Sequence, residues 1–141
     1  MPFTIDIDTP FGQRAQRRLR EEKVAWLVTM SDDATPQPVP VWFLWDRPSS
    51  FLLYSRPATA KLRNIAERPR VALHLDGDGE GGDIVVVLGD AAVTDDQPAH
   101  EVRDYVEKYA AFIARNSWTP ESFAADYSVP VRVEAKRLRG H

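Results

Sequence analysis

The sequence has no cysteine, no strong excess of one charge and no long apolar run. Without cysteine the chain cannot form disulfides, thiolate nucleophiles or zinc–thiolate centres. Its 18 basic and 21 acidic residues give a net charge of −3, whereas domains that bind nucleic acid usually carry a clear basic excess. No apolar run reaches the roughly 18 residues that a membrane-spanning helix needs, and no signal-peptide pattern is visible. We therefore expect a cytoplasmic protein that binds neither nucleic acid nor membranes.

The common nucleotide and metal motifs are missing too. The sequence contains no P-loop, no G-x-G-x-x-G and no G-x-S-x-G nucleophile elbow. Its three histidines do not share a metal-ligand spacing. The acidic segment that begins at Asp76 spaces its carboxylates like a calcium-binding loop, but its twelfth position is Val87 and not a bidentate glutamate. We therefore predict no metal site and interpret this segment as a solvated loop.

What the sequence does contain is a series of β-branched and aromatic segments joined by short polar turns. A length of 141 residues suggests one domain. The segments do not alternate with helices as a doubly wound parallel sheet requires, so we predict an α+β fold in which a small antiparallel barrel carries helices outside. The predicted strands are 24–30, 38–45, 51–55, 70–76, 84–96 and 129–140, and the predicted helices are 12–22, 59–67, 97–116 and 119–127.

Two of the strands carry residues that restrict their place in a sheet. Segment 38–45 contains two prolines, which lack a backbone donor and so confine it to a sheet edge or a bulge. Gly89 lies inside segment 84–96 and predicts a bulge or a sharp bend there.

The first candidate site lies in "LLYSRPATAKLRNI", residues 52–65, where an apolar strand turns into a helix. A helix N-terminus offers free N–H groups and a partial positive charge. Thr59 adds a capping hydroxyl, Lys61 adds a full charge, and Asn64 follows on the same helical face. This arrangement suits a phosphate, but an ordinary helix start with a solvated lysine fits the same residues.

The neighbouring segment "QPVPVWFLW" offers a surface for a planar ligand. Small apolar residues and prolines stand beside Trp42 and form a flat wall that accepts a ring, with backbone groups at the ring's polar edge. The alternative is that Trp42, Phe43 and Trp45 simply pack in the core or in a dimer contact.

Taken in order, these pieces resemble the pyridoxamine 5'-phosphate oxidase-like family of FMN-binding split barrels. Members typically show "P-x-x-x-P-V-W-F" on the second strand, then "S/T-x-K-x-x-N" opening a helix, then "P-R-V-A-L". Here the corresponding stretches read "TPQPVPVWF" and "ATAKLRNIAERPRVAL". The resemblance is strongest over residues 23–95.

The resemblance implies a homodimeric, six-stranded Greek-key split barrel with a flavin or deazaflavin at the subunit interface. It places the cofactor phosphate on a hydroxyl residue and a lysine before the helix, and the ring against the second strand. On this basis the cofactor-binding residues are Val39, Pro40, Val41, Trp42, Ser55, Arg56, Thr59, Ala60, Lys61 and Asn64.

One departure from the family pattern bears on the cofactor. Oxidases that use FMN often carry an extra arginine beside the phosphate-binding lysine, where this sequence has Ala60. The pattern is closer to the actinobacterial branch that uses coenzyme F420. The resemblance therefore implies an F420-dependent oxidoreductase that transfers hydride to a small organic acceptor. The alternatives are an FMN-dependent enzyme and a carrier or sensor without turnover. No catalytic acid or base is assigned, although Tyr54 is a candidate proton donor.

Overall fold

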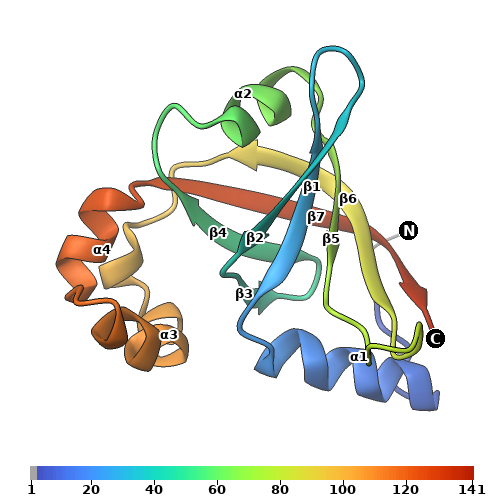
Figure 1. The fold of residues 1–141 in the computed structure, drawn as a ribbon. Coiled ribbons are helices and arrows are strands. Elements are labelled where there is room, and N and C mark those ends of the chain that lie inside the picture. Colours follow the sequence, from blue (N-terminus) through green and yellow to red (C-terminus); the bar gives the residue numbers. More distant parts are fainter. Residues whose placement is uncertain (1–2) are drawn as a thin grey trace.

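The computed structural model describes residues 3–141 and centres on one curled antiparallel sheet of seven strands, in the order β2-β1-β5-β6-β7-β4-β3 (Figure 1). Among residues 3–141, no helix combines the length and the apolar composition needed to cross a bilayer. The elements are α1 (Pro10–Glu21), β1 (Ala25–Met30), β2 (Pro36–Val41), β3 (Leu44–Arg47), β4 (Ser50–Ser55), α2 (Ala60–Glu67), β5 (Arg70–His74), β6 (Val85–Val93), the 3-10 helix η1 (Ala99–Glu101), α3 (Arg103–Arg115), α4 (Pro120–Asp126) and β7 (Val129–Gly140).

The curled antiparallel sheet with outer helices confirms the predicted fold class, but the predicted number of six strands was wrong. The segment 38–45 is not one strand, because it breaks at Phe43 into β2 and β3, which lie at opposite edges of the sheet. At the break the Phe43 N–H donates to the Tyr109 hydroxyl (2.7 Å), and the Phe43 carbonyl accepts from Lys108 Nζ (2.7 Å). Side chains of α3 thus replace the ladder partners that a continuous strand would have. The prolines correctly predicted an edge position for β2.

The helix predicted over residues 97–116 is also divided. Val102 has extended backbone angles (φ −97°, ψ 98°) and separates the single turn of η1 from α3. By contrast, the start of α4 agrees with the prediction: Thr119 is the N-cap, Pro120 is the first helical residue, and Thr119 and Ser122 form a capping box.

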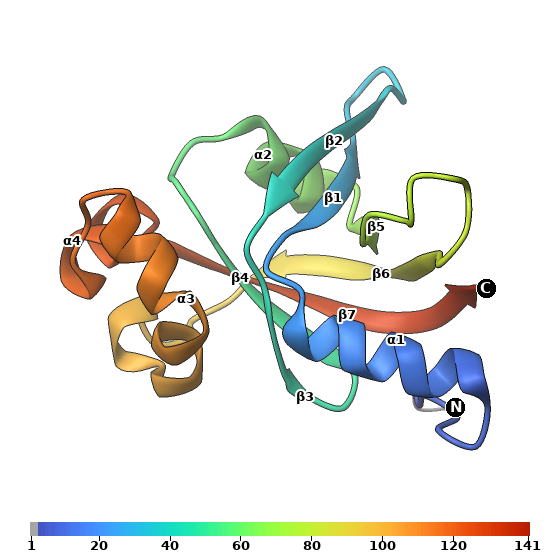
Figure 2. The same cartoon turned by 60° about the horizontal axis from the view of Figure 1, so that its bottom comes forward.

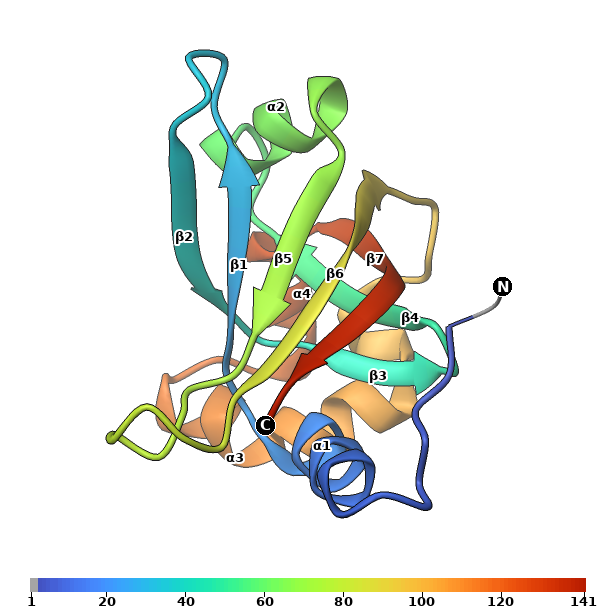
Figure 3. The ribbon, with the colours of Figure 1, turned by 90° about the vertical axis from the view of Figure 1, so that its right-hand side faces the viewer.

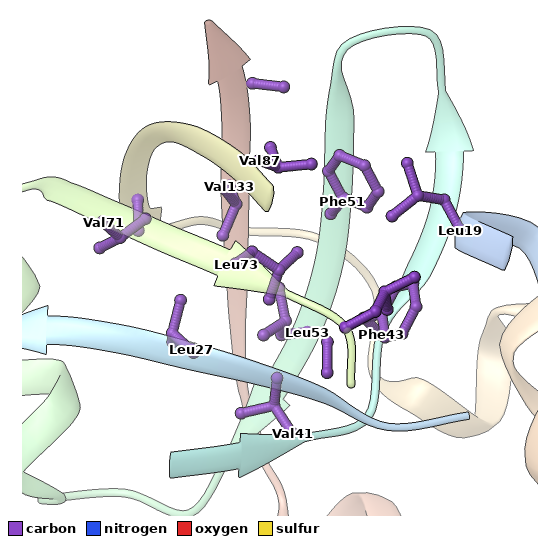
Figure 4. Packing of buried hydrophobic residues seen from close by; sticks show 14 of the residues in the cluster. Leu19, Leu27, Val41, Phe43, Phe51, Leu53, Val71, Leu73, Val87 and Val133 are labelled. Carbon is purple, nitrogen blue, oxygen red and sulfur yellow. The ribbon is translucent and has the colours of Figure 1, made fainter. Parts of the chain in front are cut away.

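The main hydrophobic core fills the inside of the curled sheet. Alternate residues of β1, β5 and β6 are buried, as expected for strands with one face on a core. Helix α1 closes one end of the barrel with Ala15 and Leu19, both at most 1% exposed. Figure 4 shows ten of these side chains meeting in the interior: Leu19, Leu27, Val41, Phe43, Phe51, Leu53, Val71, Leu73, Val87 and Val133.

Gly89 marks a bulge, as the sequence predicted. The register between β6 and β7 shifts between Leu88 and Gly89. A Cβ atom at Gly89 would lie 2.1 Å from the backbone oxygen of Glu134, so only glycine fits without a backbone shift.

The outward face of β1, β5 and β6 carries mainly apolar side chains and is not covered by a helix of residues 3–141 (Figure 3). Helix α2 lies at one end of these strands and α1 at the other, while α3 and α4 form a lobe beside β4 (Figures 1 and 2). The half-buried residues of this outward face are Trp26, Val28, Met30, Ala72, His74, Val86, Leu88 and Asp90.

A buried arginine of β7 joins three segments of the chain, namely β7, β3 and the segment after β6. Arg132 of β7 is 5% exposed and bonds to both oxygens of Asp46 (2.5 and 3.0 Å). It also bonds to both oxygens of Asp96 (2.8 and 3.2 Å). The hydrogen bonds from Arg132, together with one from Thr94, lower the pKa of Asp96 to about 2 although burial opposes this shift.

Candidate functional site

A cavity of about 200 Å³ opens between the free edge of β2, the end of β4, the start of α2 and the α3–α4 lobe. Within residues 3–141, strand β2 pairs only with β1, so its second edge has no described strand beside it. The sheet is therefore split at this place, and Lys61 enters the split from α2. The lining residues are Pro40, Val41, Trp42, Tyr54, Lys61, Tyr105, Asn116, Trp118, Phe123 and Tyr127.

Lys61 is the cation of this cavity. Its side chain is half-buried, and no ion pair or side-chain hydrogen bond joins it to another of residues 3–141. Burial alone lowers the pKa of the amine, because nothing nearby compensates the charge. A bound anion would supply that compensation. The geometry therefore suits a ligand with a negatively charged group near Lys61.

The start of α2 differs in one detail from the prediction. Thr59 is the N-cap residue, but its hydroxyl does not cap the helix. Instead Thr59 Oγ1 lies 3.2 Å from Ser55 Oγ, which donates to the Arg56 carbonyl at 2.8 Å. Because the Ser55 hydrogen is used in this way, Thr59 donates to Ser55. The two hydroxyls hold the turn together and leave the first N–H groups of α2 without a side-chain cap, as an anion site requires.

Helices α3 and α4 pack against Trp42, the aromatic residue at the end of β2. Trp42 stacks on Tyr109 (4.7 Å between ring centroids, 3° between planes) and on Phe123 (5.2 Å, 12°). Trp118 meets Trp42 edge-on at 6.4 Å. Phe43 is fully buried in the main core. Trp45 stacks on Phe51 with 5.9 Å between ring centroids, so all three rings pack within the fold, and Trp42 in addition lines the cavity.

We predict that Tyr109→Phe lowers the free energy of unfolding by about 1–3 kcal/mol, the cost of an unpaired buried polar group. The hydroxyl of Tyr109, which is fully buried, accepts from the Phe43 N–H and donates to the Lys23 carbonyl (2.8 Å). Denaturant unfolding measures the change. Tyr105→Phe on the same helix is the control, since Tyr105 lines the cavity and no hydrogen bond to another of residues 3–141 acts on its hydroxyl. Equal effects of the two variants would contradict the role given to Tyr109.

The structure divides the remaining predicted site residues between two sides of α2. Asn64 is 7% exposed, and its amide nitrogen donates to the Thr29 hydroxyl at 2.9 Å. Together with Ala60 it lines a second cavity, of about 420 Å³, between α2 and the β1–β2 hairpin. Lys61 and Asn64 were expected to serve one site, but they line different cavities in this chain.

The other three predicted residues, Val39, Ser55 and Arg56, are not among the residues that line the first cavity. Ser55 shares a small hollow with Lys61 beside the core. Arg56 is exposed, and its guanidinium lies 4.8 Å from the ring of Tyr127, which lines the cavity. Val39 is half-buried and packs against the main core.

Half of the cavity wall was not predicted as a site. Its members on α3, on α4 and in the segments that follow each helix are Tyr105, Asn116, Trp118, Phe123 and Tyr127. The sequence signal for these cavity residues was the large number of aromatic residues between positions 105 and 127. Their helical spacing led to the interpretation that they form the core face of a helix. Tyr54, considered as a proton donor, gives its hydroxyl hydrogen to the Gln97 carbonyl (2.5 Å), and burial raises its pKa.

Comparison with known proteins agrees with this architecture. The family model described as pyridoxamine 5'-phosphate oxidase matches residues 11–140. No curated protein matches the chain. Among solved structures, an F420 reductase superposes with a TM-score of 0.64 at 24% identity over 88% of this chain and 94% of its own. A conserved hypothetical protein from Mycobacterium tuberculosis gives 0.69 at 21% identity over 99% and 88%.

A third solved structure, an FAD-binding protein from Mesorhizobium loti, gives a TM-score of 0.63 at 20% identity over 89% of this chain and 88% of its own. At these identities the likeness of the structures shows a common fold. The family model, however, spans nearly the whole chain. The chain therefore belongs to the pyridoxamine 5'-phosphate oxidase family of flavin-binding split-barrel oxidoreductases.

Proposed function

We propose that this protein is an F420-dependent reductase that transfers hydride between the deazaflavin and a small organic acceptor with a conjugated double bond. The observation that carries the proposal is Lys61, a half-buried amine without a partner among residues 3–141, on the wall of an aromatic cavity. A group of this kind costs free energy in the free protein unless it binds an anion. The phosphate of a redox coenzyme is such an anion.

The residues present fit a deazaflavin or flavin. Lys61 and the uncapped N–H groups of α2 would hold the phosphate. Pro40, Val41 and Trp42 would lie along the ring. The bound coenzyme would supply two-electron chemistry, and the chain would orient it and exclude water. The aromatic residues Tyr105, Trp118, Phe123 and Tyr127 would exclude the water, since they make up a large part of the cavity wall.

Two observations favour F420 over FMN. The position beside the lysine is Ala60, where the FMN oxidases of the family often have an arginine. Lys61 is also the single charged residue lining the cavity within residues 3–141, and one cation suits the singly charged phosphodiester of F420 better than the doubly charged phosphate of FMN. One structural relative carries the name F420 reductase, which is consistent with this choice.

The uncovered outer face of the sheet supports the proposal of a homodimer. The apolar side chains on β1, β5 and β6 have no cover within residues 3–141, as is typical of an interaction surface (Figure 3). Pro40 pairs with Trp26 of this face and also lines the cavity. A second copy packed on the face would therefore border the cavity and complete its wall.

The test is a titration of the purified protein with F420 and with FMN, followed by fluorescence quenching. We expect F420 to bind more tightly by about tenfold or more, which corresponds to about 1.4 kcal/mol. Reduced F420 is then supplied with a panel of enones, and its oxidation is followed. Tighter binding of FMN would instead make the protein an FMN enzyme. Tight binding of F420 without oxidation by any acceptor would make it a carrier, and binding of neither would overturn the proposal.

A further inference from the structure

Strand β2 contains a proline at every second position. Pro36, Pro38 and Pro40 pair in register with Met30, Val28 and Trp26 of β1 (the other members, Gln37, Val39 and Val41, alternate with them). Proline has no backbone N–H and cannot donate to a ladder. The spacing therefore fixes which residues of β2 bond to β1.

In an antiparallel pair, opposed residues alternate between those that exchange hydrogen bonds and those that do not. A proline pair cannot exchange them, so Gln37, Val39 and Val41 must be the residues that bond to β1. The carbonyls of the three prolines consequently point toward the free edge of β2. Since β2 has no second neighbour in the sheet, this edge displays hydrogen-bond acceptors and no N–H from Pro36 to Val41. The next residue in the alternating series Pro36, Pro38 and Pro40 is Trp42, and it is the first of the series that has an N–H.

One end of this edge lies at the proposed coenzyme site. Pro40 and Lys61 line the same cavity, whereas Pro36 lines neither of the two cavities beside α2. A ring held between Lys61 and β2 would meet the Pro40 carbonyl, and the nearest N–H of the same alternation, that of Trp42, lies two residues further along the chain. A lone pair on the facing edge of the ring would be repelled, while a C–H group there makes a weak favourable contact.

We infer that the proline edge of β2, and Pro40 in particular, is a specificity determinant that selects a 5-deazaflavin against a flavin. The two ring systems differ at position 5, where a flavin has an unprotonated nitrogen and a deazaflavin has C–H. This inference rests on the proposed function, and it takes the ring to lie against β2 with its position 5 facing Pro40. Prolines on an edge strand also prevent that strand from pairing with strands of other molecules. The experiment must therefore separate an effect on coenzyme selectivity from an effect on strand pairing.

The experiment measures the binding of FMN and of 5-deaza-FMN to the wild type, Pro40→Ala and Pro36→Ala. The two probes share the phosphate and side chain and differ only at ring position 5. Pro40→Ala adds an N–H at the cavity. Pro36→Ala adds the same group four residues away, about 13 Å along the strand. Any general effect of replacing proline acts on both probes and cancels in the ratio of their affinities.

We expect the wild type to prefer 5-deaza-FMN and Pro40→Ala to shift the affinity ratio toward FMN by roughly 3- to 10-fold, the scale of one added hydrogen bond. Pro36→Ala should leave the ratio unchanged. An unchanged ratio in Pro40→Ala, or the same shift in both variants, would overturn the inference and leave the proposed function standing. Binding of neither probe to the wild type would overturn the inference, whereas the proposed function is overturned only if F420 itself does not bind.

Discussion

Arg132→Met is expected to lower the free energy of unfolding by about 3–5 kcal/mol, the usual cost of removing one partner from a buried ion pair. Methionine keeps much of the length of the side chain but leaves Asp46 and Asp96 facing each other without a cation. These carboxylates are 21% and 16% exposed, so water compensates them only in part. Because Arg132 joins β7 to β3 and to the segment after β6, its loss weakens three parts of the fold at once.

Denaturant unfolding of the wild type and the variant measures this change. Arg47→Met is the matched control, since Arg47 approaches the same Asp96 at 3.8 Å but is 62% exposed. The control should cost less than about 1 kcal/mol, as exposed ion pairs do. Adding Asp46→Asn and Asp96→Asn to Arg132→Met should recover part of the loss, because neutral amides do not repel each other. Equal losses for Arg132→Met and Arg47→Met would contradict this account.

Lys61→Ala is expected to weaken the binding of F420 by about 1.5–3 kcal/mol, which is roughly 10- to 150-fold. The same variant should keep or raise the stability of the free protein, because it removes a desolvated charge that has no partner among residues 3–141. Isothermal titration and thermal unfolding measure the two effects separately. A lysine with a purely structural role would show the opposite pattern, with lower stability and unchanged affinity.

Arg63→Ala on the same helix is the control for Lys61→Ala. Arg63 is exposed, its guanidinium donates to the Ala58 carbonyl, and it lines the second cavity and not the Lys61 cavity. Its removal should change the affinity less than about threefold, since an exposed charge at some distance is largely screened by salt.

Features of the fold that depend on neighbouring residues were predictable from the sequence. Gly89 marked the bulge in β6, and Thr119 with Pro120 marked the start of α4, because each acts through its own backbone. The break between β2 and β3 was not predictable. It is stabilised by Lys108 and Tyr109, which lie 65 and 66 positions further along the chain from Phe43. Locally, the apolar run 38–45 looks like a single strand.

The candidate site likewise has features that were predictable from the sequence and features that were not. The position of Lys61 in the first turn of α2 was predictable, because a lysine at a helix start after a small polar turn is a local pattern. The direction of Asn64 was not, since its buried bond to Thr29 depends on how α2 packs on β1. Nor could the aromatic half of the cavity be predicted, because periodicity places those rings on an apolar helix face without showing that the face borders a cavity.

The most direct test of the account is a cycle of four affinities. The wild type and Lys61→Ala are each titrated with F420 and with its deazaflavin chromophore lacking the phosphate side chain. If Lys61 binds the phosphate, the wild type prefers F420 by about tenfold or more, and Lys61→Ala loses most of this preference. If the preference for F420 is as strong in Lys61→Ala as in the wild type, Lys61 does not bind the coenzyme phosphate and the central claim is wrong.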